Sequence, residues 1–292
     1  MIEIAVFGNC FQADKGTQIK HVFRMLDTID ARVWIDAEFF NFLVNETGIR
    51  PNYKGLISGN DFQADIALSI GGDGTFLRTA ERIGNKGIPI LGINTGRLGF
   101  LADVPAHDID NALTEIYKNH FHVEERSLLE LYIHDIEDDS YMRHALNEIA
   151  ILKSDNSSMI TIHVNIDQGY LNSYEADGLI VATPTGSTGY SLSVGGPIIA
   201  PQATNFVISP VAPHSLTTRP LVITDCCELD IEVYSRTGAF QVAVDGNSYT
   251  LTTEKRLHIR KAPYKIKVVK RPGHTFYETL RDKLMWGADR RI

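Results

Sequence analysis

The sequence predicts an α/β domain followed by a β-rich domain. Three observations carry this prediction. In the first third, short apolar segments alternate with segments of helical spacing, the pattern of a mostly parallel sheet. After about Glu124, strand-like segments follow one another with few helical stretches between them, which predicts an all-β, sandwich-like domain. The 292 residues also exceed the usual length of one domain, so two domains are expected, at 1–123 and 124–271.

The elements of the first domain follow in regular order. Apolar runs predict strands, and apolar residues at helical spacing predict helices between them. The predicted strands are 2–7, 31–35, 66–70 and 89–93, and the predicted helices are 17–26, 76–83 and 109–117.

The second domain is predicted from period-two and continuous apolar segments. The predicted strands are 128–134, 145–152, 160–166, 206–209, 228–234, 240–244 and 257–259. Asp245-Gly246 separates the strand at 240–244 from apolar residues at 249–251, which predicts a hairpin. Helical spacing returns over 275–286.

Composition excludes several classes of protein. The net charge of -8 argues against a nucleic-acid partner. No apolar run reaches eighteen residues, and the N-terminal segment lacks the pattern of a signal peptide, so no membrane partner is expected. Three cysteines, Cys10, Cys226 and Cys227, form no even framework, which favours a reducing cytoplasm. Basic residues concentrated between Lys255 and Arg271 are interpreted as the solvated face of strands.

The most informative motif is Gly71-Gly72-Asp73-Gly74-Thr75, which joins the strand at 66–70 to the following helix. Glycines allow a backbone to turn sharply beside a ligand, and the amides at a helix start attract phosphate. Asp73 would lie at the carboxyl end of a strand, where open α/β sheets bind ligands. Phosphoryl transfer is therefore the first hypothesis. The motif lacks the Lys-Ser/Thr of a Walker loop, and Gly8-Asn9-Cys10 lacks the further glycines of a dinucleotide fingerprint.

Three other segments could carry chemistry. The stretch from Asp177 to Ser191 is rich in hydroxyls and glycine, so it could bind ribose or phosphate, or simply form a surface connection. Asn147-Glu148 interrupts an apolar strand and could hold two ribose hydroxyls, or face water at a strand end. In the segment Asn94 to Phe100, Phe100 could lie along a nucleotide ring, although packing is favoured. The ten histidines show no metal-binding spacing, so no protein-built metal site is predicted.

In order and spacing, these motifs resemble those of the NAD kinases over almost the whole chain. The G-G-D-G turn alone also occurs in diacylglycerol kinases, sphingosine kinases and 6-phosphofructokinases. The segment Thr183-Pro184-Thr185-Gly186-Ser187-Thr188-Gly189-Tyr190, with Asn147-Glu148 upstream, separates the NAD kinases from those relatives. The resemblance implies a Rossmann-like N-terminal domain, a β-rich C-terminal domain and a terminal segment, 272–292, that packs back on the first domain. It also implies a homodimer or homotetramer.

The implied reaction moves the γ-phosphoryl group of ATP, or of polyphosphate, to the 2′-hydroxyl of the adenosine ribose of NAD, with Mg²⁺ or another divalent cation across the donor phosphates. The family pattern makes Asp73 the proton acceptor and gives the donor phosphates to Gly71, Gly72, Gly74 and Thr75. The residues that it implies for NAD binding are Asp73, Gly74, Arg78, Phe100, Asn147, Glu148, Asp177, Thr188, Gly189, Tyr190, Ser191, Leu192, Ser193, Ala212 and Asn247.

Two positions depart from the family pattern. Many members have alanine where Gly189 stands, and the missing methyl is expected to loosen the adenine wall. Glu175 stands where some bacterial relatives carry a basic residue, so a pyrophosphate contact there must be made differently. Two other functions stay open from the sequence: a lipid or sugar kinase that uses the G-G-D-G turn, and a noncatalytic nucleotide sensor.

Overall fold

The structure is a computed structural model that describes residues 2–96, 98–134, 142–155 and 158–287. The chain forms two compact units. One contains the residues up to Glu125 and those from Ile266 onward, and the other contains Arg126–Lys265. Two long strands, β7 (His122–Ile133) and β18 (Leu257–Lys270), contain the two boundaries. No described helix is both long and apolar enough to cross a membrane.

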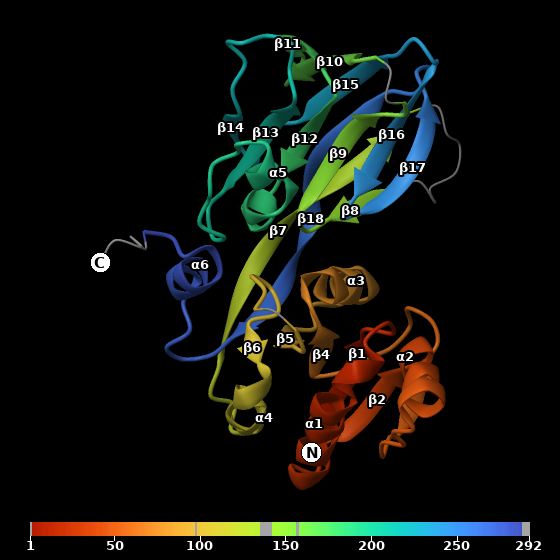
Figure 1. The fold of residues 1–292 in the computed structure, drawn as a ribbon, viewed down its shortest axis with the longest axis vertical. Coiled ribbons are helices and arrows are strands. Elements are labelled where there is room, and N and C mark those ends of the chain that lie inside the picture. The colour runs from red at the N-terminus through yellow and green to blue at the C-terminus, as the bar shows by residue number, and fades with distance from the viewer. Residues whose placement is uncertain (1, 97, 135–141, 156–157, 288–292) are drawn as a thin grey trace. The chain divides into compact units, whose positions relative to one another are not determined.

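The first unit is an α/β structure built on a parallel sheet (Figure 1). Its strands run in the order β5, β4, β1, β2, β3, and every neighbouring pair is parallel. The strands of this unit are β1 (Glu3–Gly8), β2 (Arg32–Asp36), β3 (Gly55–Ile57), β4 (Ile66–Gly71), β5 (Ile90–Asn94) and β6 (Val104–Pro105). The helices are α1 (Gly16–Thr28), α2 (Ala37–Phe42), α3 (Asp73–Ile83), α4 (Ile109–Tyr117) and α6 (Phe276–Leu284).

Helices cover both faces of this sheet. Leu68 and Ile70 of β4 lie in one buried cluster with residues of α1, α2 and α4. On the other face, α3 lies so close to β5 that a Cβ at Gly92 would be 3.0 Å from the ring of Phe76. Burial on both faces explains why β4 and β5 are continuous apolar runs rather than alternating ones.

The second unit is made of two antiparallel sheets around one core (Figure 1). One sheet has the order β14, β13, β12, β9, β16, β17; in the other, β11, β10, β15 and β18 follow one another, and β7 joins β18 and β8. The strands are β8 (Arg143–Ala145), β9 (Glu148–Lys153), β10 (Ile160–Ile166), β11 (Gly169–Ala176), β12 (Gly178–Ala182), β13 (Asn205–Val211), β14 (Leu221–Thr224), β15 (Leu229–Tyr234), β16 (Ala239–Val244) and β17 (Asn247–Thr252). Two short helical turns, Thr185–Thr188 and α5 (Tyr190–Ser193), follow β12.

The predicted fold class is confirmed: an α/β domain is followed by a β-rich one. The predicted hairpin at Asp245-Gly246 joins β16 to β17, with both residues at positive φ. One predicted strand was too long, because 145–152 is broken into β8 and β9 between Ala145 and Glu148.

The interpretation of the C-terminal basic residues as solvated was wrong for several of them. Lys270 and Arg271 are buried in the first unit, where Lys270 pairs with Asp103 and Arg271 pairs with Asp108 and Glu115. In the second unit, Arg260 pairs with Glu130 and Lys261 with Asp225. The alternation of charge along β18 reflects internal ion pairs as well as a solvated face.

Candidate functional site

The glycine-rich turn has the predicted strand–turn–helix geometry. β4 ends at Gly71, Gly72 is the N-cap of α3, and Asp73 is the first residue of that helix. A Cβ at Gly71 would lie 2.4 Å from the Thr75 hydroxyl, so only glycine allows this close packing. A Cβ at Gly72 or Gly74 would meet nothing within 4 Å. The start of α3 is therefore open to a ligand, as a phosphate-binding helix N-terminus requires.

The loop after β5 surrounds the carboxylate of Asp73. Oδ1 accepts hydrogen bonds from the backbone N–H groups of Leu101 (3.0 Å) and Ala102 (3.0 Å), and Oδ2 accepts one from Phe100 (2.9 Å). A Cβ at Gly99 would lie 2.0 Å from Oδ1, so glycine is needed there for the loop to approach. The side chain of Asp73 is consequently fixed by backbone.

A fourth donor to Asp73 comes from the C-terminal helix. The Nζ atom of Lys283, in α6, is 3.2 Å from Oδ2 of Asp73 and 4.4 Å from the ring centre of Phe100. Phe276 at the start of α6 packs on Phe100, with ring centres 6.2 Å apart. Phe100 thus packs against α6, as the sequence favoured. Lys283 was not predicted from the sequence, because nothing along the chain indicates that residue 283 reaches residue 73.

These contacts decide the charge of Asp73. Burial by itself would raise the pKa of this carboxyl group. The backbone donors Ala102 and Phe100, the charge of Lys283 and the donor Leu101 outweigh burial, and the pKa lies below its ordinary value. Asp73 is therefore ionised at neutral pH.

Arg78 lies one turn further along α3 and lines a different hollow. It donates to the Thr75 hydroxyl (3.4 Å). The hollow has a volume of about 230 Å³, and Gly8 and Cys10 at the end of β1 contribute to it, whereas Asp73 does not. Burial, followed by the charges of Glu38 and Asp36, raises the pKa of Cys10 to about 11, so this thiol is not a nucleophile at neutral pH.

In the second unit, Asn147 and Glu148 lie where β8 gives way to β9. The carboxylate of Asp245 accepts from the N–H groups of Leu146 (2.7 Å), Asn147 (2.9 Å) and Glu148 (3.0 Å). One side chain thus accepts the hydrogen bonds of three backbone N–H groups that would otherwise donate to a neighbouring strand. This explains the break in the predicted strand. Asp245 was interpreted as a turn residue only, and this second role was missed.

Two consecutive residues of this segment each carry a buried acceptor atom. Oδ1 of Asn147 and Oε2 of Glu148 are buried and have no hydrogen-bond partner among the described residues. Burial, and then the charge of Asp245, raise the pKa of Glu148 to about 7, while the backbone N–H of Tyr190 acts in the opposite direction. Buried polar atoms without hydrogen-bond partners are uncommon in folded proteins. Where they do occur, a ligand often completes the site.

The hydroxyl-rich segment wraps around this pair. A Cβ at Gly186 would lie 2.1 Å from the Asn147 carbonyl oxygen, and a Cβ at Gly189 would lie 2.8 Å from Oε2 of Glu148. In this chain, the absent methyl at residue 189 therefore leaves space beside Glu148.

Several hydroxyls of this segment are used within the fold. Ser191 is buried and bonds to the Ser209 hydroxyl (2.9 Å), while Thr188 and Ser193 donate to the carbonyl oxygens of Thr185 and Tyr190. Leu192 is half-buried, and the side chain of Tyr190 is 39% exposed. Ordered hydroxyls of this kind shape a rigid turn whose backbone faces Glu148.

The remaining predicted residues lie at strand ends of the second unit. The Asp177 carboxylate pairs with Lys153 (2.7 Å), and its N–H donates to Val211, next to Ala212. Ala212 is exposed at a φ of 44°, and Asn247 is exposed at the start of β17. The structure therefore brings Asp177 beside Ala212, and Asn247 into the hairpin of Asp245.

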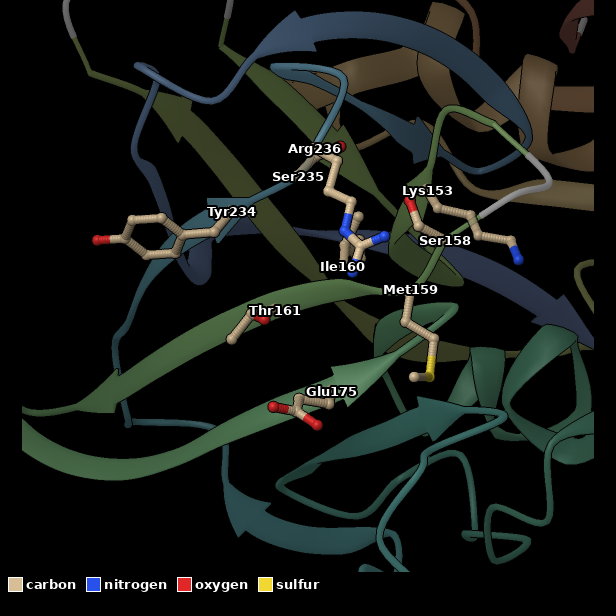
Figure 2. Close-up of a pocket in the computed structure, with 9 residues that line it drawn as sticks. All are labelled: Lys153, Ser158, Met159, Ile160, Thr161, Glu175, Tyr234, Ser235 and Arg236. Carbon is tan, nitrogen blue, oxygen red and sulfur yellow. The ribbon is translucent and has the colours of Figure 1, made fainter.

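A larger hollow of about 650 Å³ contains Glu175 and Lys153 but neither Asn147 nor Glu148 (Figure 2). Figure 2 shows Arg236 entering this hollow from the turn after β15, with Glu175 on β11. Glu175 itself is largely exposed and lies 3.9 Å from the Nδ1 atom of His214.

One side-chain cluster among the described residues has metal-ligand chemistry. His134, which directly follows β7, Asp230 of β15 and His258 of β18 have ligand atoms within 4.8 Å of one another. Both ring nitrogens of His258 already have carboxylate neighbours, Asp230 (2.8 Å) and Glu228 (3.4 Å), and these contacts account for the position of His258 in the cluster.

Both parts of the chain match known family descriptions. Residues 37–121 match the N-terminal domain of ATP-NAD kinase, and residues 146–271 match its C-terminal domain. The NAD kinase of Bacteroides fragilis (strain ATCC 25285) is 52% identical over 294 residues and 100% of both chains. The chain belongs to the ATP-NAD kinase family. As a member of this family it is a kinase that phosphorylates NAD with ATP.

One further relative and two solved structures are also similar to this chain. The NAD kinase of Porphyromonas gingivalis (strain ATCC 33277) is 43% identical over 288 residues, which are 99% of each chain. Yeast NADH kinase, crystallised with NADH, has a TM-score of 0.89 at 22% identity and covers 100% of this chain and 90% of its own. An NAD kinase from Archaeoglobus fulgidus in complex with ATP has a TM-score of 0.76 at 24% identity, over 97% and 99% of the two chains. At these sequence identities, the two structures support the fold of this chain and nothing further.

Proposed function

We propose that the chain transfers the γ-phosphoryl group of ATP to the 2′-hydroxyl of the adenosine ribose of NAD, with Asp73 as the base and Asn147 and Glu148 as ligands of NAD. The observation that carries this proposal is the pair of buried acceptor atoms, Oδ1 of Asn147 and Oε2 of Glu148, without partners among the described residues. Ribose hydroxyls donate hydrogen bonds, so they are the groups that such acceptors accommodate.

Asp73 suits the role of base because it is ionised and fixed. A hydroxyl is a weak nucleophile, and a carboxylate within hydrogen-bond reach takes its proton as the bond to phosphorus forms. Three backbone amides prevent Asp73 from turning away. The donor phosphates would lie at the open start of α3, against the amides near Gly72, Gly74 and Thr75, with Arg78 one turn further on.

A divalent cation fits the donor phosphates better than Asp73. The ammonium group of Lys283 lies 3.2 Å from the Asp73 carboxylate, and its positive charge disfavours a second cation there, while three backbone N–H groups occupy other acceptor positions. The cation would enter with ATP, where it neutralises charge on the phosphates. Asp73 then acts on the hydroxyl and not as a ligand of the metal.

The remaining NAD contacts follow the family pattern. Asp177, held by Lys153, would accept from the carboxamide or a ribose, and the turn at 188–193 would line the adenine and its ribose. Ala212 and Asn247 would lie near the nucleotide. We assign the donor and catalytic role to residues 1–123 with 272–292, and NAD binding to 124–271; the matched family regions, 37–121 and 146–271, fall within these bounds.

The proposal also includes the cellular location and the oligomeric state of the enzyme. Three cysteines that form no disulfide support a reducing cytoplasm. A homodimer or homotetramer is proposed from the family resemblance, and the molar mass in solution, measured by light scattering with and without NAD, tests it.

The experiment for the function is a coupled assay in which only NADP is detected. Purified chain, ATP, Mg²⁺ and NAD should yield NADP, and polyphosphate in place of ATP reports the donor range. Asn147→Ala and Glu148→Gln should raise the KM for NAD more than that for ATP. A similar rise in both KM values would contradict the assignment of these residues to NAD.

A further inference from the structure

Lys283 is held beside Asp73 by a helix that is anchored independently of it. The first turn of α6 has a capping box, in which Thr275 and Glu278 satisfy each other's backbone N–H groups. Leu280 is buried, and Phe276 packs on Phe100. These contacts fix α6 without the lysine, so the ammonium group is not needed to fix the helix.

Of the four described donors to the Asp73 carboxylate, the ammonium group of Lys283 is the movable one. The other three donors are backbone N–H groups at 100–102, which cannot leave without moving the loop. Lys283 reaches Oδ2 on a flexible side chain, 31% exposed, at 3.2 Å. A hydroxyl that is to give its proton to Asp73 needs an acceptor position, and the position of Lys283 is the one that can be vacated.

The ring of Phe100 can bind the displaced ammonium group of Lys283. Its ring centre is 4.4 Å from Nζ, a distance at which a cation is attracted by the ring face. An ammonium group released from Oδ2 would therefore remain within a few ångströms of the hydroxyl that replaced it. The group that meets this hydroxyl is the phosphoryl group, which is an anion.

We propose that Lys283 is a second catalytic residue: its ammonium group occupies an acceptor position of Asp73 until the acceptor hydroxyl arrives, and then contacts the phosphoryl group in transfer. The proposal rests on the assignment of Asp73 as base. In the step, the bond from the acceptor oxygen to phosphorus forms and the bond from phosphorus to the leaving oxygen of ADP breaks. The hydroxyl proton passes to Asp73 and afterwards to solvent, while Lys283 neither gains nor loses a proton.

A pH profile separates this role from a structural one. Among the described residues, the charged groups considered near Asp73 besides Lys283 already have partners: Asp103 is paired with Lys270, and Arg78 donates to Thr75, while the loop at 100–102 offers backbone amides. Removal of the charge of Lys283 should therefore raise the pKa of Asp73. The acidic limb of kcat/KM depends on ionised Asp73, so it should move to higher pH.

The test compares Lys283→Met, Lys283→Gln and Lys283→Arg with Arg281→Met, which removes an exposed charge from the same helix. We expect the Met and Gln variants to lose kcat by about 100–1,000-fold, the scale of a lost electrostatic donor to a transition state, with the acidic limb shifted upward. Lys283→Arg should recover most of kcat, and Arg281→Met should stay within about twofold of the wild type, since it removes only a solvated charge. The Gln variant retains a donor to Asp73, so it isolates charge if the Met variant folds poorly.

Two results would overturn the proposal. Unchanged kcat in both the Met and Gln variants, with or without a shift of the acidic limb, would leave Lys283 as no more than a charged neighbour of Asp73, and a raised kcat would make it an inhibitory residue. Asp73→Asn in the same assay distinguishes failure of the role of Lys283 from failure of the assignment of Asp73 as the base. If Asp73→Asn is inactive while the Lys283 variants behave as wild type, only the role of Lys283 fails; if Asp73→Asn is active, the assignment of the base fails first.

Discussion

The carboxylate of Asp245 accepts the backbone N–H of Glu148 at 3.0 Å, although 97 residues separate them in the chain. The same carboxylate also holds the N–H groups of Leu146 and Asn147. It thereby takes up the backbone N–H groups at the break between β8 and β9, the break that contains Asn147 and precedes Glu148, the first residue of β9. Its negative charge is also one cause of the raised pKa of Glu148, after burial.

Replacement of Asp245 should be more costly than replacement of an ordinary turn aspartate. Asp245→Ala leaves three amides without their acceptor, so we expect the free energy of unfolding to fall by about 2–4 kcal/mol. Asp167→Ala is the control, because Asp167 has almost the same φ (48° against 47°) but accepts a single backbone bond, from Glu228. Urea unfolding of both variants measures the difference, and equal losses would contradict the capping role of Asp245.

The raised pKa of Glu148 predicts a pH dependence of stability. The folded protein keeps a proton on Glu148 up to about pH 7, whereas the unfolded chain releases it near its ordinary value of 4.5. The contribution of this group to stability is therefore greatest below pH 4.5 and is lost as the pH rises to about 7. Glu148→Gln removes this loss, which amounts to a few kcal/mol at about 1.4 kcal/mol per pKa unit.

Urea unfolding without NAD, at intervals from pH 4.5 to 7.5, tests this. The advantage of Glu148→Gln over the wild type should grow with pH. A constant difference between Glu148→Gln and the wild type across the range would mean that Glu148 titrates normally in the fold.

Gly99 should be essential for activity and not for folding. A methyl at this residue would lie 2.0 Å from Oδ1 of Asp73, so Gly99→Ala must displace the carboxylate. We expect kcat to fall by about 100-fold, the scale of general-base removal. Gly96→Ala is the control in the same loop, because its Cβ would make only an ordinary contact at 3.9 Å with Asn94. Equal activity of the two variants would show that the loop does not position Asp73.

The sequence was sufficient for what depends on local pattern. Ile109–Tyr117 and Ile160–Ile166 were predicted at the residues where α4 and β10 lie, because their apolar spacing is regular. α2 was missed, since its six residues are too few to show a helical period. The strand predicted over 145–152 was wrong at 146–147, near its start, because the side chain of Asp245 accepts the backbone N–H groups of these two residues.

The residues of the candidate site show the same difference between local sequence motifs and long-range contacts. Asp73, Asn147 and Glu148 stand in motifs that a reader can find along the chain. Lys283 and the capping role of Asp245 could not be found in that way, because both depend on contacts between segments distant in sequence. Only the fold brings the ammonium group of α6 to the start of α3.

The most direct test of Asp73 as the base is NADP formation by the Asp73→Asn variant. The purified variant, with ATP, Mg²⁺ and saturating NAD, is compared with the wild type in the coupled assay, and its fold is checked by circular dichroism and thermal unfolding. With Asp73 as the base, the variant should keep its fold and lose turnover by about 100-fold or more. A folded variant with turnover near that of the wild type would contradict the account.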